Sequence, residues 1–111
     1  SDVYKRQGQG GAYVKANAVD LGPRYTSATR TTWVGFHISF QYPIPDIYPH
    51  HVRRDLARAD GRPLSAGMTF SRFEGFSVES VQLSRRSHHR DPAMETALVK
   101  LMKVIDWAAR T

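Results

Sequence analysis

The segment from Thr31 to Pro49, TTWVGFHISFQYPIPDIYP, constrains the fold more than any other part of this chain. Side chains alternate along it between two faces, which is the period-two pattern of a strand with one buried face. One face is apolar and the other is polar or small: Val34, Phe36, Ile38, Phe40 and Tyr42 against Gly35, His37, Ser39 and Gln41. The segment therefore predicts a half-buried strand.

Three prolines follow this strand directly, Pro43, Pro45 and Pro49. A proline has no backbone N–H to donate to a neighbouring strand, and it restricts the preceding residue to extended conformations. We therefore expect the chain to leave the sheet as a stiff, extended segment. Such a segment has little conformational freedom left to lose, so it would hold a functional loop in place.

Weaker patterns predict three more strands and one helix. The strands are expected at 12–21, before the turn signal Gly22-Pro23, at about 52–56, and at 76–84, with residues 62–75 as a loop. Asp91 is a typical N-cap and Pro92 suits the first helical position. Apolar residues then recur at helical spacing, and basic residues are expected on the solvent side: Met94, Leu98, Leu101, Ile105 and Ala108 against Lys100, Lys103 and Arg110. The order predicts an α+β fold, an antiparallel β-meander of about four strands packed against a C-terminal helix.

Length and composition favour one domain, because single domains usually take roughly 100 to 200 residues and this chain has 111. Its first residues, SDVYKRQ, resemble the translated adapter found at the ends of assembled metagenomic sequences. We therefore expect residues 1–11 to be a disordered or adapter-derived leader, residues 12–111 to be the domain, and the native N-terminus to be missing. With no cysteine, no secretory signal and no long apolar run, a cytoplasmic protein without membrane association or cofactor is expected.

The order of these elements and several short motifs resemble the ubiquitin-conjugating enzyme (UBC) superfamily. The motifs are Gly22-Pro23 at a strand end, Gly35-Phe36 at the start of the next strand, and Pro45 through Tyr48-Pro49. The segments DGRPL and LSRRSHHRDP are similar to bacterial UBC-like proteins encoded beside homologues of activating enzymes and JAB peptidases. The resemblance implies a role in a bacterial ubiquitin-like modification pathway. Its implied partners are a ubiquitin-like modifier, an activating-enzyme homologue and a JAB peptidase homologue.

The resemblance also implies a catalytic nucleophile, which this chain lacks because it contains no cysteine. Superfamily members carry the modifier as a cysteine thioester, since a thiolate is nucleophilic near neutral pH. That cysteine would align near Ser80, Val81 or Gln82. A serine hydroxyl needs an adjacent base, for which His88 and His89 are candidates. We expect a pseudoenzyme that acts mainly by binding, and its enzymatic status stays open.

A basic run before the expected helix, SRRSHHR, is the predicted binding segment. Arginine side chains beside the exposed amides of a helix N-terminus attract carboxylates and phosphates. This arrangement indicates docking of an acidic partner or of a modifier's C-terminal tail. The alternative is a solvated loop whose arginine stems cover apolar surface. The residues concerned are Arg85, Arg86, Ser87, His88 and Arg90.

Two other functions fit the composition. The net charge of +6, concentrated in HHVRRDLAR and SRRSHHR, would suit a nucleic-acid-binding α+β module, although most aromatic residues fall at core-like positions. A histidine-based metal hydrolase would draw ligands from His50-His51 and from His88, His89 and Asp91. Adjacent residues in an extended chain point to opposite faces, so each histidine pair can offer only one ligand to a metal ion. We therefore expect these histidines to be exposed in loops and not to bind a metal.

Overall fold

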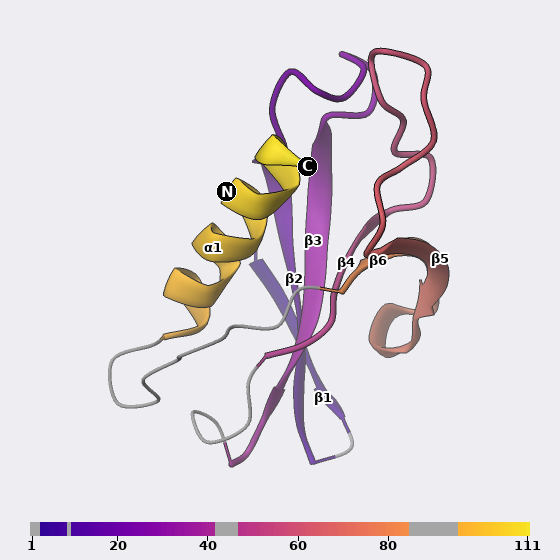
Figure 1. Ribbon diagram of the computed structural model, residues 1–111. Helices are drawn as coiled ribbons and strands as arrows, with labels where there is room; N and C mark the ends of the chain where they lie inside the picture. Colours follow the sequence, from indigo (N-terminus) through magenta and orange to yellow (C-terminus); the bar gives the residue numbers. More distant parts are fainter. Residues whose placement is uncertain (1–2, 9, 42–46, 85–95) are drawn as a thin grey trace.

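The computed structural model describes residues 3–8, 10–41, 47–84 and 96–111 (Figure 1). Within these residues, six strands form a single sheet in which every neighbouring pair is antiparallel. They are β1 (Val3–Gly8), β2 (Gly11–Asp20), β3 (Thr31–Ser39), β4 (His50–Arg53), β5 (Met68–Phe73) and β6 (Val78–Leu83). Their order across the sheet is β1-β2-β3-β4-β6-β5, so β6 lies between β4 and β5.

The helix α1 (Ala97–Arg110) packs on one face of this sheet, as Figure 1 shows. Alternate residues of the central strands meet Val104 and Ala108 in one apolar core. The core also takes in the connection between β2 and β3, where the buried Tyr25 hydroxyl donates a hydrogen bond to the Ala108 carbonyl oxygen at 2.7 Å. The strand residues in this core include Val14, Val34, Phe36, Val52, Val81 and Leu83.

The predicted α+β class is confirmed, but the expected count of about four strands is wrong. β5 lies within residues 62–75, which the sequence analysis assigned to a loop, and β1 lies within residues 1–11, which it placed outside the fold. Both are edge strands of the sheet. All but one residue of β1 are exposed, so no buried face imposes an alternating pattern on its sequence. An adapter origin for the first residues stays a prediction.

The C-terminal helix is confirmed, but its expected start and buried face need correction. Thr96 is its N-cap, with the side chain accepting a hydrogen bond from the Val99 amide at 3.1 Å, whereas Asp91 and Pro92 lie outside the described residues. Lys100, expected on the solvent side, is fully buried, and Leu98, expected in the core, is 65% exposed. Among the described residues, no helix is long and apolar enough to span a membrane.

The strand at Thr31–Ser39 ends earlier than the alternation predicts. Phe40 follows its last residue and is 75% exposed, so its assignment to the buried face is wrong. Of the proline segment, Pro43 and Pro45 lie outside the described residues. Pro49, which follows a cis peptide bond, directly precedes β4, so the segment connects two neighbouring antiparallel strands and returns the chain to the sheet.

Candidate functional site

The face of the sheet opposite α1, here called the helix-free face, carries a cluster of aromatic rings. Tyr13 lies beside His37 across β2 and β3, and the two ring centroids are 4.8 Å apart. Phe73, at the end of β5, is almost fully buried and stacks on Trp33, His51 and also Phe76, with centroids 5.1 to 6.0 Å apart. These rings form a continuous aromatic layer over the middle of the sheet.

Gly35 allows this layer to sit close to the sheet. A Cβ at this position would lie 2.7 Å from Cδ2 and 2.8 Å from Cζ of Phe73, a distance that no real Cβ contact tolerates. The glycine that the sequence analysis read as a strand-entry motif therefore leaves room for the Phe73 ring. The short helical turn η1 (Glu74–Phe76) then carries the chain across the same face.

Two cations lie over the aromatic layer. The Arg6 guanidinium is 4.7 Å from the centroid of the Phe76 ring, and the Lys15 ammonium is 5.4 Å from that of Trp33 and 5.7 Å from that of Phe76. Such cation–π contacts are each worth about 0.5–1 kcal/mol at exposed sites. The helix-free face therefore presents cations and aromatic rings together.

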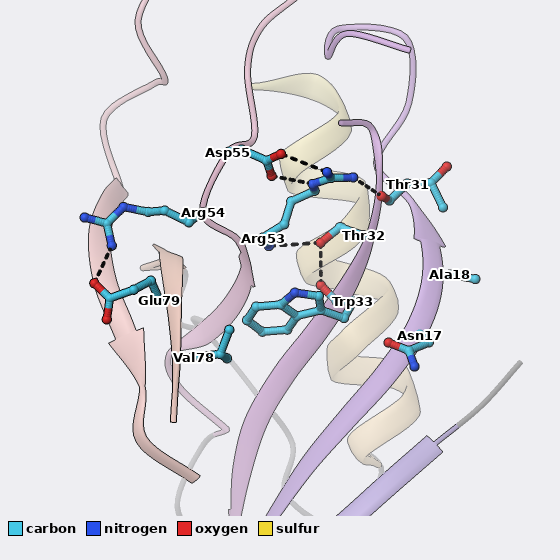
Figure 2. A pocket seen from close by; sticks show the side chains of 10 residues that line it. All are labelled: Asn17, Ala18, Thr31, Thr32, Trp33, Arg53, Arg54, Asp55, Val78 and Glu79. Atoms are coloured by element: carbon cyan, nitrogen blue, oxygen red, sulfur yellow. Dashed lines mark hydrogen bonds and ion pairs between the residues drawn. The ribbon is translucent and has the colours of Figure 1, made fainter. Parts of the chain in front are cut away.

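A pocket of about 480 Å³, here called the Trp33 pocket, opens at one end of this face (Figure 2). Figure 2 shows the Trp33 ring at its centre and two ion pairs beside it. Arg53 contacts Asp55 at 2.8 Å and Arg54 contacts Glu79 at 3.1 Å. The hydrogen bond from Arg53 lowers the pKa of the Asp55 carboxyl, which keeps that pair charged at neutral pH.

A smaller pocket of about 220 Å³ lies on the other side of Phe73. Its walls include His37, His51 and Tyr48. The Nε2 atom of His37 is buried and has no hydrogen-bond partner within the part of the chain that the structure describes.

Ser80 has a histidine partner, although not one that the sequence analysis considered. The Nδ1 atom of His51 on β4 and the Oγ atom of Ser80 on β6 are 2.9 Å apart, and both residues are buried. Burial lowers the pKa of His51, so its ring is neutral at pH 7. Ser80 is 0% exposed, however, and a nucleophile must reach its substrate. In this conformation the pair connects two strands and does not form an accessible catalytic dyad.

The other two candidate positions on this strand, Val81 and Gln82, differ in burial. Val81 is fully buried on the face that packs against α1. Gln82 is partly buried, and its side-chain amide donates to the Ser84 hydroxyl at 3.2 Å. All three positions belong to β6, an interior strand of the sheet.

The predicted docking segment and the alternative base lie outside the described residues. These are Arg85, Arg86, Ser87, His88, His89, Arg90 and Asp91. His50 and His51 point to opposite faces of the sheet, as expected: His50 packs against Phe36 on the helix side, and His51 against Phe73 on the other. Both are buried, so the expectation of exposed loop histidines is wrong for this pair. Among the described residues, no group of three or more potential ligands could hold a metal ion.

Comparison with known proteins leaves the chain without a family assignment. No family model, curated protein or solved structure matches it. The UBC resemblance therefore stays a prediction.

The residues that form the helix-free face were not predicted as a site, because most aromatic residues were expected in the core. The alternation of side chains along the strands did indicate which residues lie on this face. Trp33 lies one position out of phase with Val34 and Phe36, and Tyr13 and Lys15 lie out of phase with Val14. Residues out of phase with the core belong to the opposite face.

Proposed function

We propose that this protein acts by binding, as a UBC-like component of a bacterial ubiquitin-like modification pathway, and that the helix-free face is its binding surface. The observation that carries the binding role is the complete burial of Ser80 in an interior strand. Ser80, one of the three positions that could correspond to the superfamily's cysteine, is thus closed to a modifier, while Arg6 is exposed and Lys15, Tyr13, Trp33 and Phe76 are partly exposed on the helix-free face.

The partner that we propose is a ubiquitin-like modifier or an activating-enzyme homologue. The sequence motifs support this choice, and so does the arrangement of β1 to β4 as a consecutive antiparallel meander with a helix on one face. Exposed Arg6 and partly exposed Lys15, set among aromatic rings, suit a partner surface that combines carboxylates with apolar groups. Rings in such contacts contribute most of the affinity, and cations set orientation and association rate.

A titration with a bacterial ubiquitin-like protein at physiological salt tests this proposal. We expect a saturable complex that weakens when Arg6 and Lys15 are both replaced by alanine. Lys5→Ala is the matched control, because Lys5 is an exposed cation on the same strand as Arg6 but faces the other side of the sheet. Equal effects of Lys5→Ala and Arg6→Ala, or no complex at all, would refute the assignment of this face.

The absence of transfer chemistry can be tested with a cysteine at position 80. We expect the thiol of Ser80→Cys to react with a soluble thiol reagent only as fast as the protein opens, because the native position is fully buried. The same variant should form no thioester with a modifier and its activating enzyme. A thioester would contradict the binding-only role.

Single-stranded nucleic acid is a second candidate partner, favoured by the cations that lie over aromatic rings on one sheet face. Proteins that bind single strands combine basic residues with rings on which bases stack. For such binding, the logarithm of the association constant falls with the logarithm of salt concentration, by roughly 0.7 per phosphate contact. Removing Arg6 and Lys15 should then reduce the slope by about 1.4. A slope that does not change would exclude this candidate.

A further inference from the structure

The Trp33 pocket combines a flat apolar surface with polar groups at its margin. Trp33 supplies the ring, and the side chains of Asn17 and Thr31 also line the pocket (Figure 2). The pairing between β2 and β3 shifts register between Ala16 and Val19, so Asn17 and Ala18 fall outside the paired positions. Ala18 takes a left-handed conformation there, with φ of 62°. The bulge thus turns an amide-bearing side chain and irregular backbone toward the space beside the indole.

The charges around the Trp33 pocket indicate what kind of ligand it suits. Arg53 forms an ion pair with Asp55, and Arg54 forms one with Glu79. The rim of the pocket therefore offers both hydrogen-bond donors and acceptors, and its net charge does not favour a simple anion. Lys15 does not line the pocket itself, but its ammonium lies over the Trp33 ring, 5.4 Å from the centroid, and no carboxylate pairs with it in the described part of the chain. A ligand that carries both a polar planar ring and a negative group would match this distribution.

We propose that the Trp33 pocket binds a nucleobase of a nucleotide, with the base against the indole and the phosphate toward Lys15. A nucleobase has a π-face that can stack on the indole. Unlike an apolar ring, it also carries hydrogen-bond donors and acceptors at its edge. The volume of about 480 Å³ falls within the roughly 300–1,000 Å³ of ordinary ligand pockets. This site goes beyond the binding of a protein partner. The base can belong to a free mononucleotide or to a single strand.

Titrations with AMP, GMP, CMP and UMP, with the corresponding nucleosides, and with a short oligothymidylate test the proposal. Trp107→Phe provides a background in which Trp33 is the sole indole, because the chain has two tryptophans. In that background we expect ligand-dependent quenching of Trp33 fluorescence. Trp33→Leu should weaken binding about 5- to 150-fold by calorimetry, and Trp33→Phe should weaken it less.

The phosphate contact has its own readout. Lys15→Ala should weaken the mononucleotides about two- to fivefold and leave the nucleosides unchanged, because only the former carry the negative group. If only oligothymidylate binds, and its binding depends on Trp33, the site recognises a base within a single strand. If mononucleotides bind as well, the site also accepts the base of a free nucleotide.

Three results would overturn the proposal: no binding of any probe, binding that is unaffected by Trp33→Leu, or a Lys15→Ala effect that is equal for nucleosides and nucleotides. If Trp33→Leu does not fold, Asn17→Ala and Lys15→Ala replace it, and unchanged affinity in both would be equally decisive. Binding of a ubiquitin-like protein is measured separately, so its failure can be distinguished from failure of this site.

Discussion

Replacing Ser80 with alanine tests whether its hydroxyl is a structural partner of His51. The hydroxyl is fully buried, and its only described partner is His51 Nδ1 at 2.9 Å. The substitution leaves that nitrogen without a partner in a ring that is 8% exposed, where water cannot readily replace the hydrogen bond. An unsatisfied buried polar group costs about 1–3 kcal/mol, so we expect a loss of about 2 kcal/mol in the free energy of unfolding.

The same loss can be expressed as a shift in the melting temperature. At about 2.1 cal/mol/K per residue, unfolding 111 residues has an entropy of roughly 0.23 kcal/mol/K, so 2 kcal/mol lowers Tm by about 9 °C. Thermal and urea unfolding followed by circular dichroism measure both quantities. Ser71→Ala is the matched control, because Ser71 pairs opposite Ser80 on β5 but is partly exposed. It should change stability by less than about 0.5 kcal/mol.

A double-mutant cycle with His51→Phe isolates the contact. Phenylalanine preserves a ring against Phe73 and removes both imidazole nitrogens. A coupling free energy between Ser80→Ala and His51→Phe of about 0.5–3 kcal/mol is expected for residues in direct contact. Zero coupling, together with a Ser80→Ala change below 0.5 kcal/mol, would refute the buried hydrogen bond.

The cycle has a pH readout as well. Burial lowers the pKa of folded His51 below the 6.5 of the unfolded chain, so the unfolded state binds more protons between those two values. This contribution to stability is complete above pH 6.5 and is lost as pH falls through the folded pKa. His51→Phe should remove that part of the pH dependence, whereas the other four histidines are the same in both proteins.

Three further substitutions test the fold. The hydrogen bonds from Arg30 and the Gly22 amide lower the pKa of Asp20 from 3.8 to about 2, so Asp20→Asn should be less stable than wild type at pH 7. Urea unfolding should show this difference shrinking as pH falls from 3.8 through 2. Gly35→Ala should be destabilising by about 1–3 kcal/mol because the added methyl collides with the Phe73 ring; a neutral result would mean that the ring can move away from Gly35 at little cost and is not fixed against it. Phe36→Ala should cost about 3–5 kcal/mol, since Phe36 is 4% exposed, and a near-zero change in chemical denaturation would contradict its place in the core.

Strands β2 and β6 could be predicted from the sequence to within about two residues at each end, although their patterns are weaker than that of β3. The segment 12–21 corresponds to β2 at Gly11–Asp20, and 76–84 corresponds to β6 at Val78–Leu83. Val34 and Phe36 are buried as expected, because a period of two fixes which residues share a face once one face is apolar. The residues on the buried face of α1 could not be predicted in this way. Lys100 is buried and Leu98 is exposed, and hydrophobicity alone ranks them in the opposite order.

The contacts of the candidate site could not be predicted, because they depend on which strands are neighbours. His51 and Ser80 are 29 positions apart, and Arg6 reaches Phe76 across a still longer separation. Local patterns determine which way each side chain points but not which strand lies beside it. The edge strand β1, which carries Arg6, has no buried residue that could produce an alternating pattern.

The position of β6 determines how far Ser80 is buried. If the strands followed chain order across the sheet, β6 would be an edge strand. Instead the hairpin of β5 and β6 is inserted so that β6 pairs with β4, and β5 covers its other side. This arrangement buries Ser80 and brings Phe73 over Gly35, where it supports Trp33. One feature of the topology therefore both buries Ser80 and builds the aromatic layer on which the proposed binding surface rests.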